Sequence, residues 1–188
     1  MAAARNIYVF HGAGSGIGYA LNPTDSAGNP DAGYNASFVD TPGHLRFKLA
    51  DDSNKNTASP VVVPPSGSNY SFEKRTKIKF TSAPPAEIVN LRWFNTPPGT
   101  VQTGAKINVK SDVSYTQGTS SPVPGMTDSA VYTNTNPLLL NAGTVISSAG
   151  FSPGFGNQPY VVCQIEVTSA AASGVTLDHG LSYRYDEF

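Results

Sequence analysis

The chain has 188 residues, of which 13% are charged and 39% hydrophobic, and its formal net charge is −1 at pH 7. This balance lacks the clustered Lys and Arg that bind phosphate backbones, so we expect no direct contact with nucleic acid. No apolar run approaches the length of a membrane span, the single Cys excludes an intramolecular disulfide, and abundant Gly and Pro favour strands and turns over helices.

The first forty residues are dominated by Gly, Asn, Pro, Asp and Ala, and only Ile7–Phe10 suggests a strand. We therefore predict that residues 1–40 form an N-terminal arm or long loop, followed by a sandwich domain at 41–188. Long irregular segments are uncommon in compact domains unless they bind something, so a partner surface is expected in the arm. The start of the chain has no basic and apolar leader, which predicts synthesis in a cytoplasm.

Alternation of apolar and polar residues predicts most of the remaining elements. Strands are expected at 45–49, 71–80, 88–94, 105–113, 161–167 and 181–186. Two short strands about a turn are expected at 138–140 and 144–146, and residues 130–133 can extend. Val61–Val63, which lies between two prolines, is predicted as an edge strand or an extended connector. Residues 118–125 and 151–159 are predicted loops.

Eight or nine short strands separated by turns predict an all-β chain, namely a single β-sandwich of jelly-roll or immunoglobulin-like kind with extended loops. The apolar positions of the alternating strands should form its core. The predicted core residues are Leu45, Phe47, Ile78, Phe80, Leu91, Trp93, Ile107, Val109, Ile165 and Tyr183. Cys163 falls in the same alternation and is expected to be a small buried hydrophobe.

Charged residues on two strands are expected to face outward. Lys74, Arg75, Lys77 and Lys79 surround the apolar Ile78 and Phe80, so we interpret them as the solvated face of a strand, with an acidic-partner or phosphate patch as the alternative. In the last strand Tyr183 and Tyr185 should point inward, which leaves Arg184 and Asp186 to face a neighbour or solvent.

A glycine motif near the start resembles the nucleotide fingerprint of short-chain dehydrogenases. His11–Gly18 reads HGAGSGIG and follows the apolar residues Ile7–Phe10. The fingerprint needs a helix after the glycines, but Pro23 arrives before two helical turns can form. Asn141–Gly143 and the Tyr70/Lys74 pair resemble that family's other signatures in the wrong order. We therefore predict no bound nucleotide.

The sequence also lacks the motifs typical of metal sites and of other catalytic sites. His11, His44 and His179 lack metal-ligand spacing, and the acidic turn at Asp51–Asn54 lacks the alternating acids and closing Glu of a calcium loop. No nucleophile elbow or spaced carboxylate pair is visible. The sequence predicts no catalytic, cofactor or metal residues, and hence a binding module or an assembly component.

The last third of the chain resembles small virion proteins of tailed bacteriophages. The residues that carry the resemblance are the Thr/Asn-rich stretch Val131–Pro137, Tyr160 and the ending Ser182–Glu187. The resemblance implies a capsid decoration or cement protein: a β-sandwich, often a trimer, that sits on the virion surface and bridges subunits of the major capsid protein. A tail or baseplate component and a carbohydrate-binding module are the alternatives.

The predicted interface combines the arm with the final strand, whose edge could accept a neighbouring strand. Its candidate residues are Tyr8, Phe10, Tyr19, Tyr34, Phe38, Arg184, Asp186 and Phe188. The loops at 118–125 and 151–159 should lie at its periphery. Truncation after Gly180 is expected to abolish folding or assembly.

Overall fold

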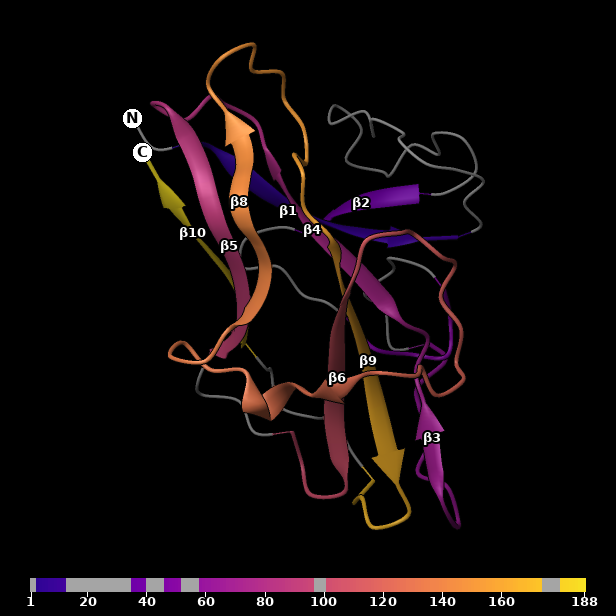
Figure 1. The fold of residues 1–188 in the computed structure, drawn as a ribbon. Helices are drawn as coiled ribbons and strands as arrows, with labels where there is room; N and C mark the ends of the chain where they lie inside the picture. Colours follow the sequence, from indigo (N-terminus) through magenta and orange to yellow (C-terminus); the bar gives the residue numbers. More distant parts are fainter. Residues whose placement is uncertain (1–2, 13–34, 40–45, 52–57, 97–100, 174–179) are drawn as a thin grey trace.

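A computed structural model describes residues 3–12, 35–39, 46–51, 58–96, 101–173 and 180–188, and for 35–39 it describes the backbone alone. Ten strands and one short 3₁₀ helix make up this part of the chain (Figure 1). They are β1 (Arg5–His11), β2 (Asn35–Val39), β3 (Ser68–Tyr70), β4 (Lys74–Phe80), β5 (Glu87–Thr96), β6 (Ala105–Asp112), β7 (Thr127–Asp128), η1 (Ser129–Val131), β8 (Leu138–Ser147), β9 (Tyr160–Thr168) and β10 (Gly180–Glu187).

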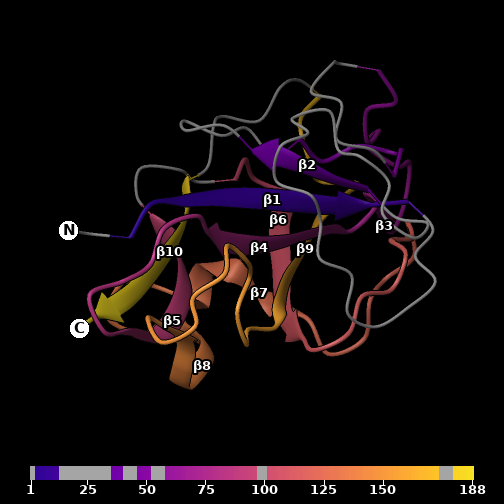
Figure 2. The ribbon, with the colours of Figure 1, turned by 90° about the horizontal axis from the view of Figure 1, so that it is seen from above.

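The strands form two antiparallel sheets, which confirms the predicted all-β sandwich. The larger sheet has seven strands in the order β2-β1-β4-β9-β6-β7, with β3 also paired to β9, and the smaller has the order β10-β5-β8. The strand direction of the larger sheet turns steadily from β6 and β9 to β1 and β2, the usual right-handed twist (Figure 1). Seen from above, the smaller sheet lies against one face of it (Figure 2).

The main core lies between the two sheets. Trp93, Leu91 and Ile88 of β5 meet Ile78 and Phe80 of β4. Strands β6, β8 and β9 complete the layer with buried residues that include Ile107, Val109, Leu140, Val145, Ile146, Val161, Cys163 and Ile165. All predicted core residues within the described ranges belong to this cluster or pack against it, and Leu45 lies outside those ranges.

Strand β10 forms one edge of the smaller sheet and closes one side of the core. Tyr183 and Tyr185 pack against the core, and the Tyr185 ring meets Phe80 edge-on with centroids 5.2 Å apart. The inward orientation predicted for the two tyrosines is therefore confirmed. Opposite Tyr185, the partner strand β5 contains a bulge at Asn90, whose φ of 53° is left-handed.

Three predicted elements differ from the structure. Residues 46–49, predicted as part of a strand, form none: the bonds Leu49 N–Ser59 O and Phe72 N–Lys48 O join them to two different segments and make no continuous ladder. The two short strands expected around residue 142 are one strand, β8, which follows the bulged β5 through several register shifts. Residues 129–131 form η1 rather than extending, with Asp128 capping it.

The N-terminal segment contributes two strands to the larger sheet. Strand β1 pairs antiparallel with both β4 and β2, so residues 5–11 and 35–39 are part of the sandwich. The glycine motif thus connects two adjacent antiparallel strands, whereas the nucleotide fingerprint connects parallel strands through a helix. Residues 13–34, to which the arm prediction also applies, lie outside the described ranges.

Strand β4 is buried on both faces, which corrects the prediction that its cations are solvated. Lys74, Arg75 and Lys79 are each 3% exposed or less. The outer face of the larger sheet carries a second, aromatic cluster of Tyr8, Phe10, Tyr160 and Val162, against which Tyr115, Met126 and Phe155 pack. Arg75, Lys77 and Lys79 lie among these rings. The loops predicted at 118–125 and 151–159 are indeed irregular.

Candidate interaction surface

The outer face of the smaller sheet is the candidate surface, and it is defined here by Arg92, Phe94, Leu139, Arg184 and Asp186. Alternation places these side chains opposite to the inward-facing Trp93 and Tyr183. Arg184 lies opposite Arg92 on the neighbouring strand, and Leu139 lies opposite Arg92 on the other side. The five residues therefore span all three strands of the sheet.

The charged side chains of this surface are held in place. Asp186 accepts hydrogen bonds through Oδ2 from Arg92 Nη2 at 2.7 Å and from Asn90 Nδ2 at 2.8 Å. Arg184 lies over the Phe94 ring, 5.9 Å from its centroid, and donates from Nη1 to Asn134 Oδ1. Arg92 thus has a carboxylate partner, whereas Arg184 has a neutral amide and a ring in the described part of the chain.

Apolar side chains are exposed beside these charges. Leu139 on β8 is 63% exposed, and Phe188, just after β10, is 62% exposed. The backbone of Phe188 is nevertheless fixed, because its N–H donates to Glu87 O at 2.9 Å and its carbonyl accepts from Glu87 N at 3.0 Å. Arginine and aromatic residues are the types enriched at protein interfaces, and this sheet offers an ordered Arg184 and an exposed Phe188.

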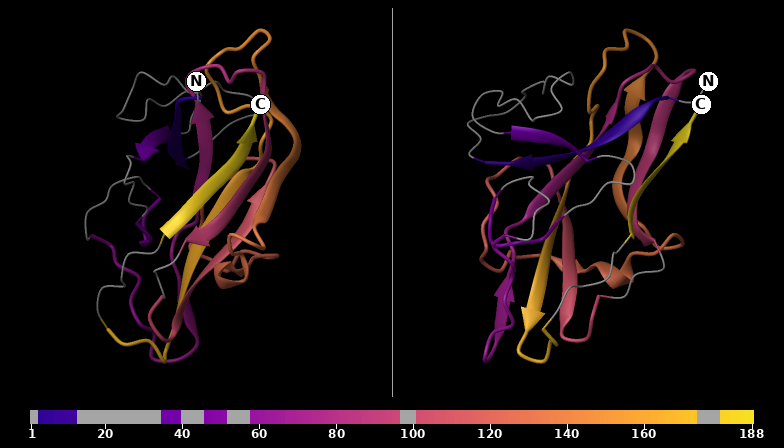
Figure 3. Two further views of the ribbon diagram at one scale, coloured as in Figure 1. Left: turned by 90° about the vertical axis from the view of Figure 1, so that its left-hand side faces the viewer. Right: turned by 180° about the vertical axis from the view of Figure 1, so that it is seen from behind.

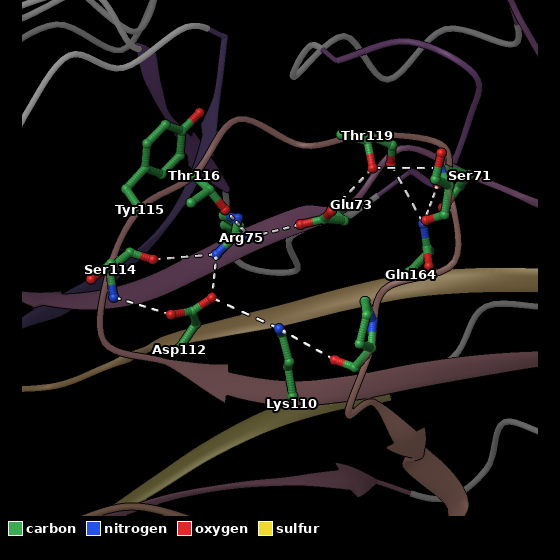
Figure 4. A network of polar contacts seen from close by, with 12 residues as sticks. Ser71, Glu73, Arg75, Lys110, Asp112, Ser114, Tyr115, Thr116, Thr119 and Gln164 are labelled. Atoms are coloured by element: carbon green, nitrogen blue, oxygen red, sulfur yellow. Dashed lines mark hydrogen bonds and ion pairs between the residues drawn. The ribbon is translucent and has the colours of Figure 1, made fainter.

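A second ordered site is a polar network at the end of β4 (Figure 4). Arg75 Nη2 donates to Glu73 Oε2 at 2.7 Å, and Nη1 donates to Asp112 Oδ2 at 3.2 Å. Arg75 also bonds Thr116 Oγ1 and the Ser114 carbonyl. Because Glu73 and Arg75 are both buried, the two carboxylates offset the cost of burying the guanidinium.

This network fastens the loop after β6 across the outer face of the larger sheet. Glu73 N donates to Thr119 O at 3.1 Å, and Gln164 Nε2 donates to the Ser71 and Ser121 carbonyls, each at 2.9 Å. The Tyr115 hydroxyl donates to Gly12 O at 2.6 Å. Hydrogen bonds therefore join the loop after β6 to β4, to β9 and to the end of β1, which indicates a structural role for the network.

This network was not predicted from the sequence, because each of its residues was considered separately. One signal was present: Glu73 and Arg75 are two residues apart, which places both side chains on the same face of a strand. The sequence places Asp51 in an acidic turn. In the structure its carboxylate accepts hydrogen bonds from Gly12 N at 2.9 Å and from Gln117 Nε2 at 3.2 Å. Its carboxylate therefore also helps to hold the loop after β6 in place.

The aromatic cluster holds Lys77 in a poorly hydrated position. Its Nζ lies 3.9 Å from the centroid of the Tyr160 ring, and burial lowers the pKa of Lys77 to about 8. Lys79 contacts the Tyr8 and Phe155 rings on the same face. The contacts of Lys77 and Lys79 are to strands and loops of this chain, so both lysines contribute to packing.

The structure separates the predicted interface residues into three groups. Arg184, Asp186 and Phe188 lie at the surface of the smaller sheet. Tyr8 and Phe10 are each 3% exposed and belong to the aromatic cluster, so their rings offer little surface to a partner. Tyr19 and Tyr34 lie outside the described ranges, as does the side chain of Phe38 on β2.

The described residues contain no reactive thiol, no grouped metal ligands and no membrane-spanning helix. Burial raises the pKa of the Cys163 thiol to about 12, which keeps it in the unreactive protonated form. In the described part of the chain no three His, Cys, Asp or Glu side chains are grouped as metal ligands, and no helix there has the length and apolarity needed to cross a membrane.

Comparison with known proteins found no matching family model, curated protein or solved structure.

Proposed function

We propose that this chain is a non-enzymatic structural protein of a virus particle, a capsid decoration or cement protein that binds the major capsid protein on the virion surface. The observation that supports the proposal most is the ordered outer face of the smaller sheet. An arginine held over a ring, with an exposed leucine and phenylalanine on the same sheet, suits contact with another protein surface.

The fastened loops also support this role. A protein that grips preformed neighbours loses less entropy on binding when its surface is already ordered. Here the Arg75 network and the Asp51 contacts order the loop after β6 before any partner arrives. Synthesis in the host cytoplasm followed by addition to the shell is the pathway we propose.

A test is co-sedimentation of the purified chain with empty shells of the major capsid protein encoded in the same genome. We expect the chain to pellet with the shells and to raise the temperature at which they disrupt. Leu139→Asp should weaken this binding, because it places a charge in the proposed contact. Val62→Asp is the matched control, since Val62 is 55% exposed and lies outside both the smaller sheet and the loop after β6.

Failure of the wild-type chain to pellet with shells would contradict the proposal, and equal binding by the Leu139→Asp variant would place the contact elsewhere. Binding to tail or baseplate proteins instead would support the second candidate. A carbohydrate-binding role is less favoured, because Tyr183 and Tyr185, which could have stacked on sugars, face the core. A glycan-binding screen tests that alternative directly.

A further inference from the structure

Strand β10 has one open side. Its neighbour in the sheet is β5, and among the described strands none pairs along its other edge. The left view of Figure 3 shows β10 running in front of the smaller sheet as its edge. An edge strand presents unpaired backbone N–H and C=O groups, which can accept another strand.

The printed hydrogen bonds identify which backbone groups point outward. Phe188 and Glu87 exchange both of their backbone hydrogen bonds, so Phe188 faces β5. Backbone groups of successive residues point to opposite sides of a strand. Tyr183, Tyr185 and Glu187 therefore direct their N–H and C=O groups to the open side.

The strand is regular enough to pair along this edge. A bulge often protects an edge strand, and here the register does shift between Arg184 and Asp186. Their partners on β5 are Arg92 and Val89, so two steps along β10 match three steps along β5. The extra residue, at Asn90, belongs to β5, and β10 keeps its alternation.

The charges of β10 are complementary to a second copy of the same strand. When two copies pair antiparallel about a two-fold axis at Tyr185, each Arg184 lies opposite Asp186 of the other copy. An axis at Arg184 would oppose two arginines, and an axis at Asp186 would oppose two aspartates. An axis at Tyr183 would leave Arg184 opposite Ser182, so the register at Tyr185 is the best matched.

Both charged groups have capacity for this contact. In the described part of the chain the hydrogen bonds of Asp186 use Oδ2, so Oδ1 can accept from a second arginine. Arg184 there donates from Nη1 to Asn134, and its other nitrogens can donate to a carboxylate.

We propose that two copies of this chain pair through their β10 strands about a two-fold axis at Tyr185. The smaller sheets then join into one six-stranded sheet, and the two outer faces become one continuous surface. This contact gives a dimer in place of the trimer implied by the resemblance. It does not depend on the proposed function.

Light scattering after size-exclusion chromatography tests the proposal on the full chain. Over about 10 to 500 μM, a range suited to a small interface, we expect the mass to approach twice the 19.7 kDa of one chain. Arg184→Glu and Asp186→Lys should each weaken association roughly tenfold or more, because like charges then face each other. An equimolar mixture of the two variants should associate again, since its opposed charges are complementary.

Lys106→Gln on the larger sheet is the control: it removes a surface charge away from β10, keeps a donor for Glu166, and should dimerise like the wild type. Thermal unfolding checks that each variant is folded. Amide hydrogen exchange provides a second measurement: the Tyr183, Tyr185 and Glu187 amides should exchange more slowly as concentration rises. A monomer over the whole range, a trimer, or a dimer insensitive to both charge reversals would overturn the proposal.

Discussion

Trp93 is the largest side chain in the centre of the core. It is 1% exposed, and its ring meets Tyr132 edge-on with centroids 6.4 Å apart. Trp93→Ala should lower the free energy of unfolding by about 3–5 kcal/mol, because it removes apolar contacts and leaves a cavity. Urea unfolding followed by circular dichroism measures this loss, because the signal does not depend on fluorescence from the chain's one tryptophan. Trp93→Phe should cost less, and a near-neutral alanine variant would contradict the burial.

Arg75 carries the buried polar network. Replacement by Met would leave the buried Glu73 carboxylate without its arginine, which predicts a loss of about 3–5 kcal/mol of unfolding free energy. The control is the double variant Glu73→Gln/Arg75→Met, which removes the orphaned charge together with its partner. It should be more stable than Arg75→Met alone in urea unfolding. A double variant that loses as much as the sum of both single variants would show that the pair is not coupled.

Cys163 should make stability depend on pH in the alkaline range. Burial raises the pKa of its thiol from 9.0 to about 12, so above pH 9 the unfolded chain releases a proton that the folded chain keeps. The contribution of Cys163 is therefore fully present below pH 9 and is lost as pH rises toward 12, by about 1.4 kcal/mol per pH unit.

Urea unfolding at pH 8 and pH 10 measures this effect. Burial also raises the pKa of Tyr183, so the wild type should lose stability through both groups. Cys163→Ala removes only the thiol and should lose less stability than the wild type between the two pH values. An identical loss in both proteins would contradict the thiol's contribution.

At the scale of elements, periodicity predicts strands well and burial less well. The strands at β5, β6, β9 and β10 were predicted near their observed bounds, because their apolar residues alternate toward one core. In β4 and β9 the second face is buried as well. The sequence of β4 looks half-solvated, but Arg75 pairs with the carboxylates of Glu73 and Asp112. Lys77 lies against the ring of Tyr160. Of these partners, Asp112 and Tyr160 are far from β4 in the chain.

For the candidate surface, the sequence predicted the orientation of side chains within one strand but not their contacts with other strands. Alternation within β10 places Arg184 and Asp186 outward, as expected, but the contacts that fix them come from β5 and from Asn134. Tyr8 and Phe10 were assigned to an interface because residues 1–40 were predicted to be an arm that contacts a partner. The pairing of β1 with β4, which places both rings in the aromatic cluster, is a long-range contact that local periodicity does not encode.

Strand β10 supplies the edge of the smaller sheet, so its removal should affect the whole fold. Truncation after Gly180 deletes the inward-facing Tyr183 and Tyr185 and leaves one side of β5 unpaired. We expect loss of the cooperative thermal transition seen by circular dichroism. Phe188→Ser is the control and should keep it, because this side chain is exposed and its pairing uses the backbone. A truncated chain that folds and binds shells would contradict both the fold role and the proposed interface of β10.

At the scale of the whole molecule, polar contacts join the two sheets at the side where β10 lies. Ala3 N donates to Glu187 Oε1 at 2.8 Å, and the Arg5 guanidinium lies over the Tyr185 ring, 5.5 Å from its centroid. Deeper in, Thr76 Oγ1 on β4 and the Tyr183 hydroxyl on β10 are hydrogen-bonded at 2.7 Å. The edge strand of one sheet is therefore fixed to the centre of the other, which keeps its open side regular.

The Thr76–Tyr183 hydrogen bond gives a test of this connection. Tyr183→Phe keeps the ring but leaves the buried Thr76 hydroxyl without this partner, so the free energy of unfolding should fall by about 1–3 kcal/mol. The double variant Tyr183→Phe/Thr76→Val removes both polar groups at nearly constant shape and should recover part of that loss. Thermal and urea unfolding of the two single variants and the double variant give the coupling energy. A coupling near zero would mean that this hydrogen bond does not help to join the sheets, and would contradict the proposed connection between β10 and β4.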